Sequence, residues 1–194
     1  MIAAASGTGK TSITHALLKA EPELHLSISV TTRAPRPGER DGEHYLFRSQ
    51  PEFDAMKAAG QLLESAGVFG RSYATPRAPV AKALAEGRDI VFDIDWQGHR
   101  QLREALPHDV VSLFLLPPSR AALESRLHAR GSDSPEEIAR RMDLAAAELS
   151  HAPEFDHVLV NENFDRTLAE TRAILHAARS ATARQADLAE FLRE

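Results

Sequence analysis

The sequence predicts an α/β fold in which helices flank a parallel β-sheet. Short apolar runs alternate with longer helical patterns along the chain, which is typical of this class. A glycine-rich turn follows the first apolar run and precedes a helical pattern. The 194 residues are 43% hydrophobic and 26% charged, and they contain no internal repeat. Such a chain can bury one core, so we expect a single domain over 1–194 with small inserted parts.

The core of this fold is expected to come from three stretches, 1–30, 77–125 and 151–180. Apolar runs predict its strands over 2–5, 26–30, 90–94, 110–116 and 157–160. Helical patterns cover 10–20, 98–106, 119–129, 135–149 and 165–179.

Three segments differ from this core in composition. Residues 31–76 are rich in Gly, Pro and Arg, with β-like pieces at 44–47 and 68–69 and a helical pattern near 51–59. They predict an inserted mixed α/β lobe. Residues 126–150 are charged and helical, which favours a lid, and 181–194 form a polar helical tail.

Composition excludes several kinds of chemistry. The chain has no cysteine, which excludes disulfides, cysteine-ligated metals and thiol nucleophiles. No apolar run approaches the roughly 20 residues of a membrane helix, and the first ten residues lack a basic leader. The net charge of −5 argues against nonspecific nucleic-acid binding. We therefore expect a cytoplasmic protein with small-molecule partners, no membrane and no nucleic acid, and the sequence leaves its oligomeric state open.

The strongest local signal is the run Ser6-Gly7-Thr8-Gly9-Lys10-Thr11, which lies between a possible strand and a helix. This is the context of a phosphate-binding P-loop, where backbone N–H groups, a lysine and a hydroxyl on Mg²⁺ hold the phosphates of ATP. The alternative is a flexible glycine turn at a helix start. We assign ATP binding to the loop and its flanks: Ala4, Ala5, Ser6, Gly7, Thr8, Gly9, Lys10, Thr11 and Ser12.

Two details of this loop depart from the usual pattern. Ala4 stands where the motif has its first glycine. Only five residues precede Ser6, so we expect an unusually short first strand or a natural start upstream of Met1.

A second group of polar residues lies in the predicted lobe. Arg33 and Arg36 flank Pro35, and two guanidinium forks held this close could clamp one phosphate. Nineteen of the 23 basic residues are arginine, either for phosphate recognition or through a general preference for that residue. For the loop itself, the alternative is a solvated basic segment.

Two carboxylates end one of the predicted core strands. Asp93 and Asp95 are two residues apart, so they point to the same face at the carboxyl end of the strand, where open α/β sheets bind ligands. Their oxygens suit the N1–H and exocyclic amine of guanine, or water around a magnesium ion. The alternative is a helix or turn cap.

Six segments together resemble the guanylate kinases of the bacterial type, within the nucleoside monophosphate kinases. In order, they are SISVTTRAPRPGE, DGEHY, SYATPR, DIDWQG, RLHARGSDS and VLVNEN. The resemblance covers about residues 2–180 and implies a P-loop kinase fold with a parallel core, a GMP-binding lobe and a helical lid. It also implies Mg²⁺-dependent transfer of the γ-phosphate of ATP to GMP, giving ADP and GDP.

The resemblance also implies roles for individual residues. The GMP site would comprise Ser29, Arg33, Arg36, Tyr45, Glu64, Tyr73, Thr75, Asp93 and Asp95. Glu64, Thr75 and Asp95 would read the guanine, with Asp93 nearby, and the others would hold the phosphate. The catalytic cations would be Lys10, Arg33, Arg126, Arg130 and Arg141. Asn161 matches a position that contacts adenine, and Thr11 would hold the metal.

Two other functions fit the sequence less well. A ribose bisphosphate kinase would not need the guanine-reading set of Glu64, Thr75 and Asp95. Non-catalytic interaction modules of guanylate-kinase type tend to lose the P-loop lysine or the lid arginines, which this chain keeps. Ala5 and Ala74 replace the Pro and Gly common in the family, and neither change removes a charged or hydrogen-bonding group.

Overall fold

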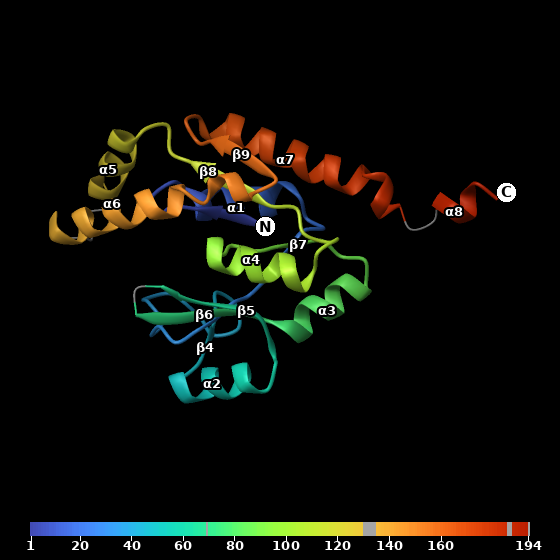
Figure 1. Cartoon of the computed structure of the whole chain (residues 1–194), viewed down its shortest axis with the longest axis horizontal. Helices are drawn as coiled ribbons and strands as arrows, with labels where there is room; N and C mark the ends of the chain where they lie inside the picture. The colour runs from blue at the N-terminus through green and yellow to red at the C-terminus, as the bar shows by residue number, and fades with distance from the viewer. Residues whose placement is uncertain (69, 130–134, 186–187, 194) are drawn as a thin grey trace.

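The structure, a computed structural model, describes residues 1–68, 70–129, 135–185 and 188–193. It consists of a parallel core, a mixed lobe beneath it and a pair of helices at one end (Figure 1). The core holds two parallel sheets, in the strand orders β1-β8-β9 and β2-β7. Ile2 joins them, because its N–H donates to the carbonyl of Phe92 at 2.9 Å. The core strands are β1 (Ile2–Ala4), β2 (His25–Leu26), β7 (Ile90–Val91), β8 (Leu113–Leu116) and β9 (His157–Val160).

Helices cover both sides of this core. On one side, α1 (Lys10–Ala20) and α7 (Phe164–Ser180) contact each other and pack on a buried cluster that includes Ile13, Leu17 and Leu115. On the other side, α4 (Trp96–Ala105) lies between the core and the lobe and contacts both β1 and β5 (Figure 1). Because α4 touches both parts, it can set the position of the lobe relative to the core.

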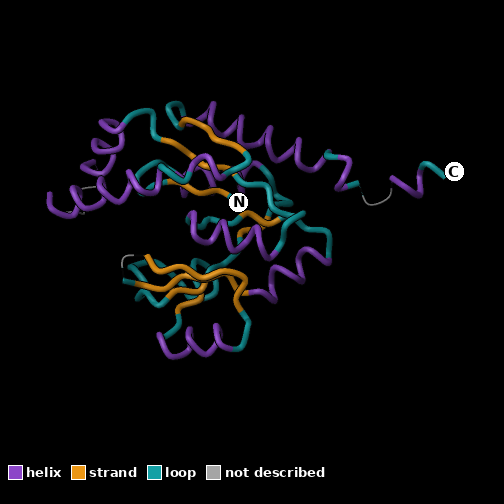
Figure 2. The backbone as a smooth tube through the Cα atoms, in the orientation of Figure 1, coloured by secondary structure: helices purple, strands orange, loops and turns teal. Residues whose placement is uncertain are grey.

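The lobe is a separate sheet with the strand order β4-β3-β6-β5 (Figure 2). Its strands are β3 (Val30–Thr31), β4 (Leu46–Phe47), β5 (Leu62–Val68) and β6 (Arg71–Pro76). Helix α2 (Gln50–Ala58) begins with a capping box between Ser49 and Glu52 and buries Phe53 against Val30 and Ala74. Helix α3 (Arg77–Ala85) returns the chain to the core.

Two helices project at one end of the core, where the sequence predicts a lid (Figure 1). They are α5 (Arg120–Ala129) and α6 (Pro135–Leu149), and they share a buried cluster with Ala5 beside the P-loop. The short 3-10 turns η1 (Ala152–Glu154) and η2 (Thr182–Arg184) and helix α8 (Leu188–Phe191) complete the described chain. None of the described helices combines the length and apolar character that crossing a membrane requires.

Most predicted elements form near their expected places, but three predicted strands are wrong in extent. The run 110–116 is a strand only over Leu113–Leu116. The run 26–30 is not one strand, because Leu26 pairs with β7 in the core while Val30 pairs with β4 and β6 in the lobe. The lobe sheet therefore begins at Val30, one residue before the predicted boundary. The run 90–94 is a regular strand only over Ile90–Val91, and Asp93 adds a single bridge to Ile2.

Candidate active site

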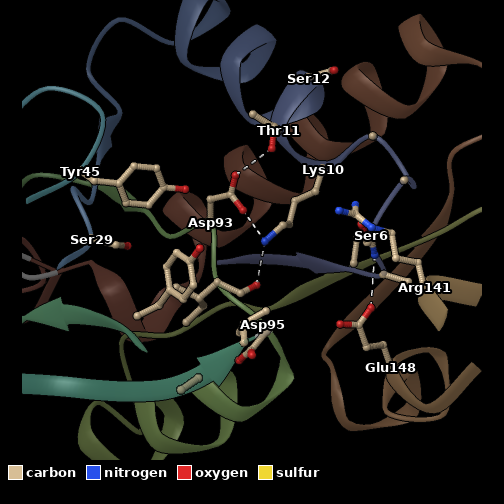
Figure 3. Close-up of a pocket in the computed structure, with 18 of the residues that line it drawn as sticks. Ser6, Lys10, Thr11, Ser12, Ser29, Tyr45, Asp93, Asp95, Arg141 and Glu148 are labelled. Carbon is tan, nitrogen blue, oxygen red and sulfur yellow. Dashed lines mark hydrogen bonds and ion pairs between the residues drawn. The ribbon is translucent and has the colours of Figure 1, made fainter. Parts of the chain in front are cut away.

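The P-loop and the lobe enclose one cavity of about 340 Å³ (Figure 3). It lies at the carboxyl ends of the core strands, as expected for an open α/β sheet. Sixteen of its lining residues are Ala4, Ala5, Ser6, Gly7, Gly9, Lys10, Thr11, Ser12, Ser29, Arg36, Tyr45, Glu64, Tyr73, Asp93, Asp95 and Arg141, all of them predicted site residues. Ala66, Val68, Ile94 and Glu148 line it as well and were not predicted. Predicted residues outside this lining are Thr8, Arg33, Thr75, Arg126 and Asn161.

The P-loop backbone has the shape of an anion cradle. Gly7 and Gly9 have φ angles of 90° and 103°, a conformation that side chains disfavour. At Gly9 a Cβ would lie 2.7 Å from the Asn161 amide nitrogen, so only glycine fits there. Helix α1 starts immediately after Gly9 with no side-chain cap on its first N–H groups. Uncapped N–H groups at a helix N-terminus form a binding site for phosphate oxygens.

Asn161 and Arg126, both predicted to contact the nucleotide, hold this loop through hydrogen bonds to the Thr8 carbonyl. Asn161 follows β9, and its amide donates to the Thr8 carbonyl at 2.7 Å. Arg126 on α5 donates to the same carbonyl at 3.1 Å and to the Asn161 carbonyl at 2.9 Å. In this conformation both side chains fix the loop. The adenine contact of Asn161 and the phosphoryl contact of Arg126 stay predictions.

Lys10 and Thr11 both face Asp93. The Lys10 ammonium forms an ion pair with Asp93 and donates to the Ile94 carbonyl at 3.2 Å. The Thr11 hydroxyl lies 3.4 Å from the second Asp93 oxygen. Asp93 therefore turns toward the P-loop (Figure 3). A hydroxyl and a carboxylate side by side offer the hard oxygen donors that Mg²⁺ prefers. The described residues contain no group of three or more His, Asp or Glu side chains that could hold a metal alone.

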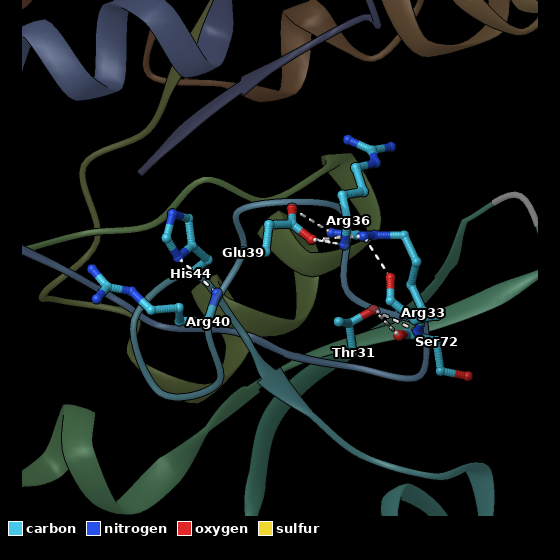
Figure 4. A network of polar contacts seen from close by, with 8 residues as sticks. Thr31, Arg33, Arg36, Glu39, Arg40, His44 and Ser72 are labelled. Atoms are coloured by element: carbon cyan, nitrogen blue, oxygen red, sulfur yellow. Dashed lines mark hydrogen bonds and ion pairs between the residues drawn. The ribbon is translucent and has the colours of Figure 1, made fainter.

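The predicted pair of arginines does not form a joint clamp in this conformation. Arg33 is ion-paired with Glu39 through both terminal guanidinium nitrogens, at 2.8 and 2.9 Å (Figure 4). Its guanidinium also lies over the Tyr45 ring, 5.2 Å from the ring centroid. The pKa of Glu39 is lowered from 4.5 to about 2, and the hydrogen bonds from Arg33 are the largest cause. Arg36 donates only its backbone N–H to Glu39, and its guanidinium extends away toward the cavity (Figure 4).

Glu64 is a buried carboxyl group on β5. It is 4% exposed and accepts a 2.7 Å hydrogen bond from the hydroxyl of Thr75, which is fully buried on β6. Burial raises the pKa of Glu64 to about 7, and the nearby Asp95 charge contributes. Asp95 caps helix α4 by accepting the Gly98 N–H at 2.9 Å, which is the alternative that the sequence left open for this residue. Asp95 also lines the cavity.

Helix α6 reaches the P-loop through two side chains on one face. The Glu148 carboxylate accepts the Ser6 N–H at 3.2 Å, and an Arg141 nitrogen lies 3.4 Å from the Ser6 hydroxyl. Burial raises the pKa of Glu148. Glu148 was not predicted, although its spacing of seven residues from Arg141, two helical turns, was a signal that could have found it. The predicted lid residue Arg130 lies outside the described residues.

Comparison with known proteins identifies the family. A family model described as guanylate kinase matches residues 1–178. The chain belongs to the guanylate kinase family. It is 59% identical over 192 residues to the guanylate kinase of Granulibacter bethesdensis, covering 99% of this chain and 90% of that one. It is 58% identical over 192 residues to that of Gluconobacter oxydans, covering 99% and 92%.

A solved structure supports the same assignment. The crystal structure of guanylate kinase from Anaplasma phagocytophilum superposes with a TM-score of 0.81 at 33% identity, covering 99% of this chain and 92% of that one. Guanylate kinases transfer the γ-phosphate of ATP to GMP, giving ADP and GDP. The predicted family and α/β P-loop kinase fold are therefore confirmed, and the predicted enzyme class of ATP:GMP phosphotransferase is that of the guanylate kinase family.

Proposed function

We propose that this chain transfers the γ-phosphate of ATP to GMP in the cavity between its P-loop and its lobe. The main support for this proposal is that residues of the P-loop and residues of the lobe line the same cavity. Lys10 and Thr11 reach it from the P-loop, while Arg36, Tyr45 and Glu64 reach it from the lobe or its edge. Phosphoryl transfer needs two anionic substrates aligned at one place, and this arrangement provides it. Since both substrates are free nucleotides, we place the reaction in the cytoplasm.

The ATP phosphates would lie in the P-loop, bound by its backbone N–H groups and by Lys10. The clamp of Asn161 and Arg126 on Thr8 supports this role because it holds the loop in place before any substrate arrives. A loop that is already ordered loses less conformational entropy when it binds phosphate.

Thr11 and Asp93 would hold Mg²⁺ with the phosphates. Their oxygens lie 3.4 Å apart, face the same space and are donors of the type that Mg²⁺ prefers. Two protein ligands leave the remaining positions to water and phosphate oxygens, as is usual for this ion. Bound there, the ion would neutralise charge on the transferring phosphate.

The GMP phosphate would lie between Ser29, Arg36, Tyr45 and Tyr73, which line the lobe side of the cavity. Arg33 would join them by exchanging the Glu39 carboxylate for the phosphate of GMP. Its fork now binds the Glu39 carboxylate, which stands in for a phosphate group with similar bidentate geometry. Substrate binding would thus release Glu39 and close the loop around GMP.

The guanine would be read by Glu64, Thr75 and Asp95. Glu64 and Asp95 line the cavity, and Thr75 holds Glu64 through its hydroxyl. Carboxylates match the two donors on one edge of guanine, whereas adenine presents an acceptor at N1. A buried carboxylate facing adenine would remain unpaired, and unpaired buried groups are what make such sites selective.

The transfer itself needs no strong base. An oxygen of the GMP phosphate is already anionic, so it forms the new bond to the γ-phosphorus while the bond to the β-γ bridging oxygen breaks and ADP leaves. Lys10 and Arg141, both lining the cavity, would offset the negative charge, and Arg126 and Arg130 would join them on lid closure. Closure would also exclude water and limit ATP hydrolysis.

A coupled assay of ADP release with GMP, AMP, CMP and UMP tests this proposal. We expect turnover with GMP to exceed that with the other nucleotides by orders of magnitude. Glu64→Ala should lower kcat/KM for GMP at least about tenfold and narrow the preference for GMP over AMP. Glu43→Ala, an exposed glutamate of the same lobe, is the matched control and should change neither. Absence of turnover with every nucleotide would favour the interaction module instead.

A further inference from the structure

Gln101 of helix α4 forms hydrogen bonds with the backbone of β5, the edge strand of the lobe. The Gln101 amide accepts the Ser65 N–H at 3.0 Å and donates to the Ser65 carbonyl at 2.9 Å. Strand β5 is the outer strand of the lobe sheet, so these backbone groups face away from β6. The Gln101 amide therefore takes the place of a neighbouring strand, and it does so at the residue next to Glu64.

The same face of α4 also touches Glu64. Gly98 lies one turn before Gln101, and a Cβ at Gly98 would lie 2.7 Å from the Glu64 Oε2 atom and 3.1 Å from Ile94. The Glu64 carboxyl group thus lies directly against the helix backbone, in space that any other residue would fill. Its other oxygen is held by the Thr75 hydroxyl at 2.7 Å.

The pairing of strand β5 is irregular immediately before Glu64. The register between β5 and β6 is irregular between Leu62 and Glu64. A strand with a local irregularity has a less defined path and side-chain direction at that point. The ladder resumes with Glu64 opposite Thr75 and Ser65 opposite Ala74, and the two Gln101 hydrogen bonds hold the free side of the strand at Ser65, the residue next to Glu64.

We infer that Gln101, with the gap left by Gly98, is a positioning residue that holds Glu64 in place to select guanine. This inference rests on the proposed function, in which Glu64 reads the guanine edge. Gln101 does not line the cavity and touches no substrate, so it acts through Glu64. A carboxylate that must meet two donors of one base tolerates little displacement, because hydrogen bonds weaken steeply with misalignment.

Gln101→Met tests the inference because methionine keeps the length of the side chain and removes both hydrogen bonds to Ser65, together with the one to the Gln97 carbonyl within α4 at 3.2 Å. We expect the preference for GMP over AMP to fall at least about tenfold, through a raised KM for GMP, with KM for ATP unchanged. Gln50→Met is the control. It removes another glutamine that joins lobe elements, accepting from the Ser72 hydroxyl at 3.3 Å away from Glu64. It should leave the preference unchanged.

A double variant separates positioning from general support of the fold. In the Glu64→Ala background, Gln101→Met should cause no further loss of preference, since the group it positions is gone. Gly98→Ala gives a second test, because alanine raises helix propensity yet would displace Glu64. We expect the preference to fall in that variant without a fall in melting temperature.

The outcomes distinguish this inference from the proposed function. If the wild type prefers GMP and Glu64→Ala loses that preference, but Gln101→Met keeps it, Glu64 reads guanine without help from α4 and the inference is wrong. Equal losses from Gln101→Met with and without Glu64 would also overturn it, since they indicate general support. If the wild type itself shows no preference for GMP, the proposed function fails and the inference fails with it.

Discussion

Lys10 of the P-loop and Asp93 of the neighbouring strand end form an ion pair across the candidate active site. Asp93 also faces the Thr11 hydroxyl at 3.4 Å, so one carboxylate contacts both P-loop side chains that would act on ATP. The Lys10 ammonium is held further by the Ile94 carbonyl. In this conformation Asp93 and the Ile94 carbonyl therefore hold the Lys10 ammonium at the cavity.

Removing the Lys10 ammonium should nearly abolish turnover. Lys10→Ala loses a charge that would stabilise the transferring phosphate, roughly 3–5 kcal/mol or at least about 10²-fold in kcat. The fold should persist, because Asp93 is partly exposed and water can solvate it. Steady-state kinetics and thermal melting measure both effects. Lys19→Ala, an exposed lysine in the last turn of the same helix, should leave kcat unchanged. A Lys10→Ala enzyme with a kcat near that of the wild type would contradict the assignment.

Truncating Arg36 should weaken GMP far more than ATP. Its guanidinium lines the cavity on the lobe side, away from the P-loop. Loss of a charge-assisted fork costs about 1.5–3 kcal/mol, so KM for GMP should rise roughly 10- to 150-fold while KM for ATP stays constant. Arg40→Ala removes an exposed arginine of the same loop, paired with Glu43, and serves as the control. A raised KM for ATP with an unchanged KM for GMP would place Arg36 at the other substrate.

The raised pKa of Glu64 predicts that GMP binding depends on pH. Glu64 must be ionised to accept the guanine donors, and its pKa is about 7. As the pH falls from 8 to 6, the protonated fraction grows, so GMP affinity should fall, by up to about tenfold for each pH unit below 7.

Calorimetric titration of GMP into the wild type and Glu64→Gln across this range measures the effect. The phosphate of GMP titrates equally in both experiments, so the difference between the two profiles reports Glu64. Parallel profiles would show that Glu64 does not control guanine binding.

Glu21, a buried carboxylate outside the cavity lining, should contribute to the stability of the fold. Glu21 ends α1 and binds Arg172, His176 and Arg179 of α7, each at 2.9 Å. These contacts, led by the Arg172 hydrogen bond, lower the pKa of Glu21 from 4.5 to about 2. Its stabilising contribution is therefore present above pH 4.5 and is lost as the pH falls through about 2.

Glu21→Gln should lower the free energy of unfolding at pH 7 by about 1–3 kcal/mol, because two arginines and a histidine of α7 lose the carboxylate that they bind. Thermal melting at pH 7 should show a fall of about 2–4 °C for each kcal/mol. Glu23→Gln makes the same charge change at an exposed site two residues away and should have little effect. Equal melting temperatures for the two variants would mean that the α1–α7 ion pairs contribute nothing measurable.

Local patterns in the sequence were enough to predict most elements of the core and the P-loop side of the cavity lining, while the family resemblance supplied most of the lobe side. Helix α1 follows from two glycines before Lys10, and α6 and β9 lie where their periodicity places them. Such features depend on hydrogen bonds and side-chain spacing within a few residues, which the order of amino acids specifies directly. The predicted family also follows from ordered motifs along the chain.

Tertiary structure decided which polar groups meet. It alone divided 26–30 between two sheets, engaged Arg33 with Glu39, and placed Arg126 beneath the P-loop. It alone brought Gln101 to Ser65 across 36 residues of sequence. An arginine or an amide can bond to any suitable partner, and its own sequence neighbours do not say which. For Gln101, the packing of α4 against β5 makes that choice, because it brings the amide within hydrogen-bond distance of the Ser65 backbone.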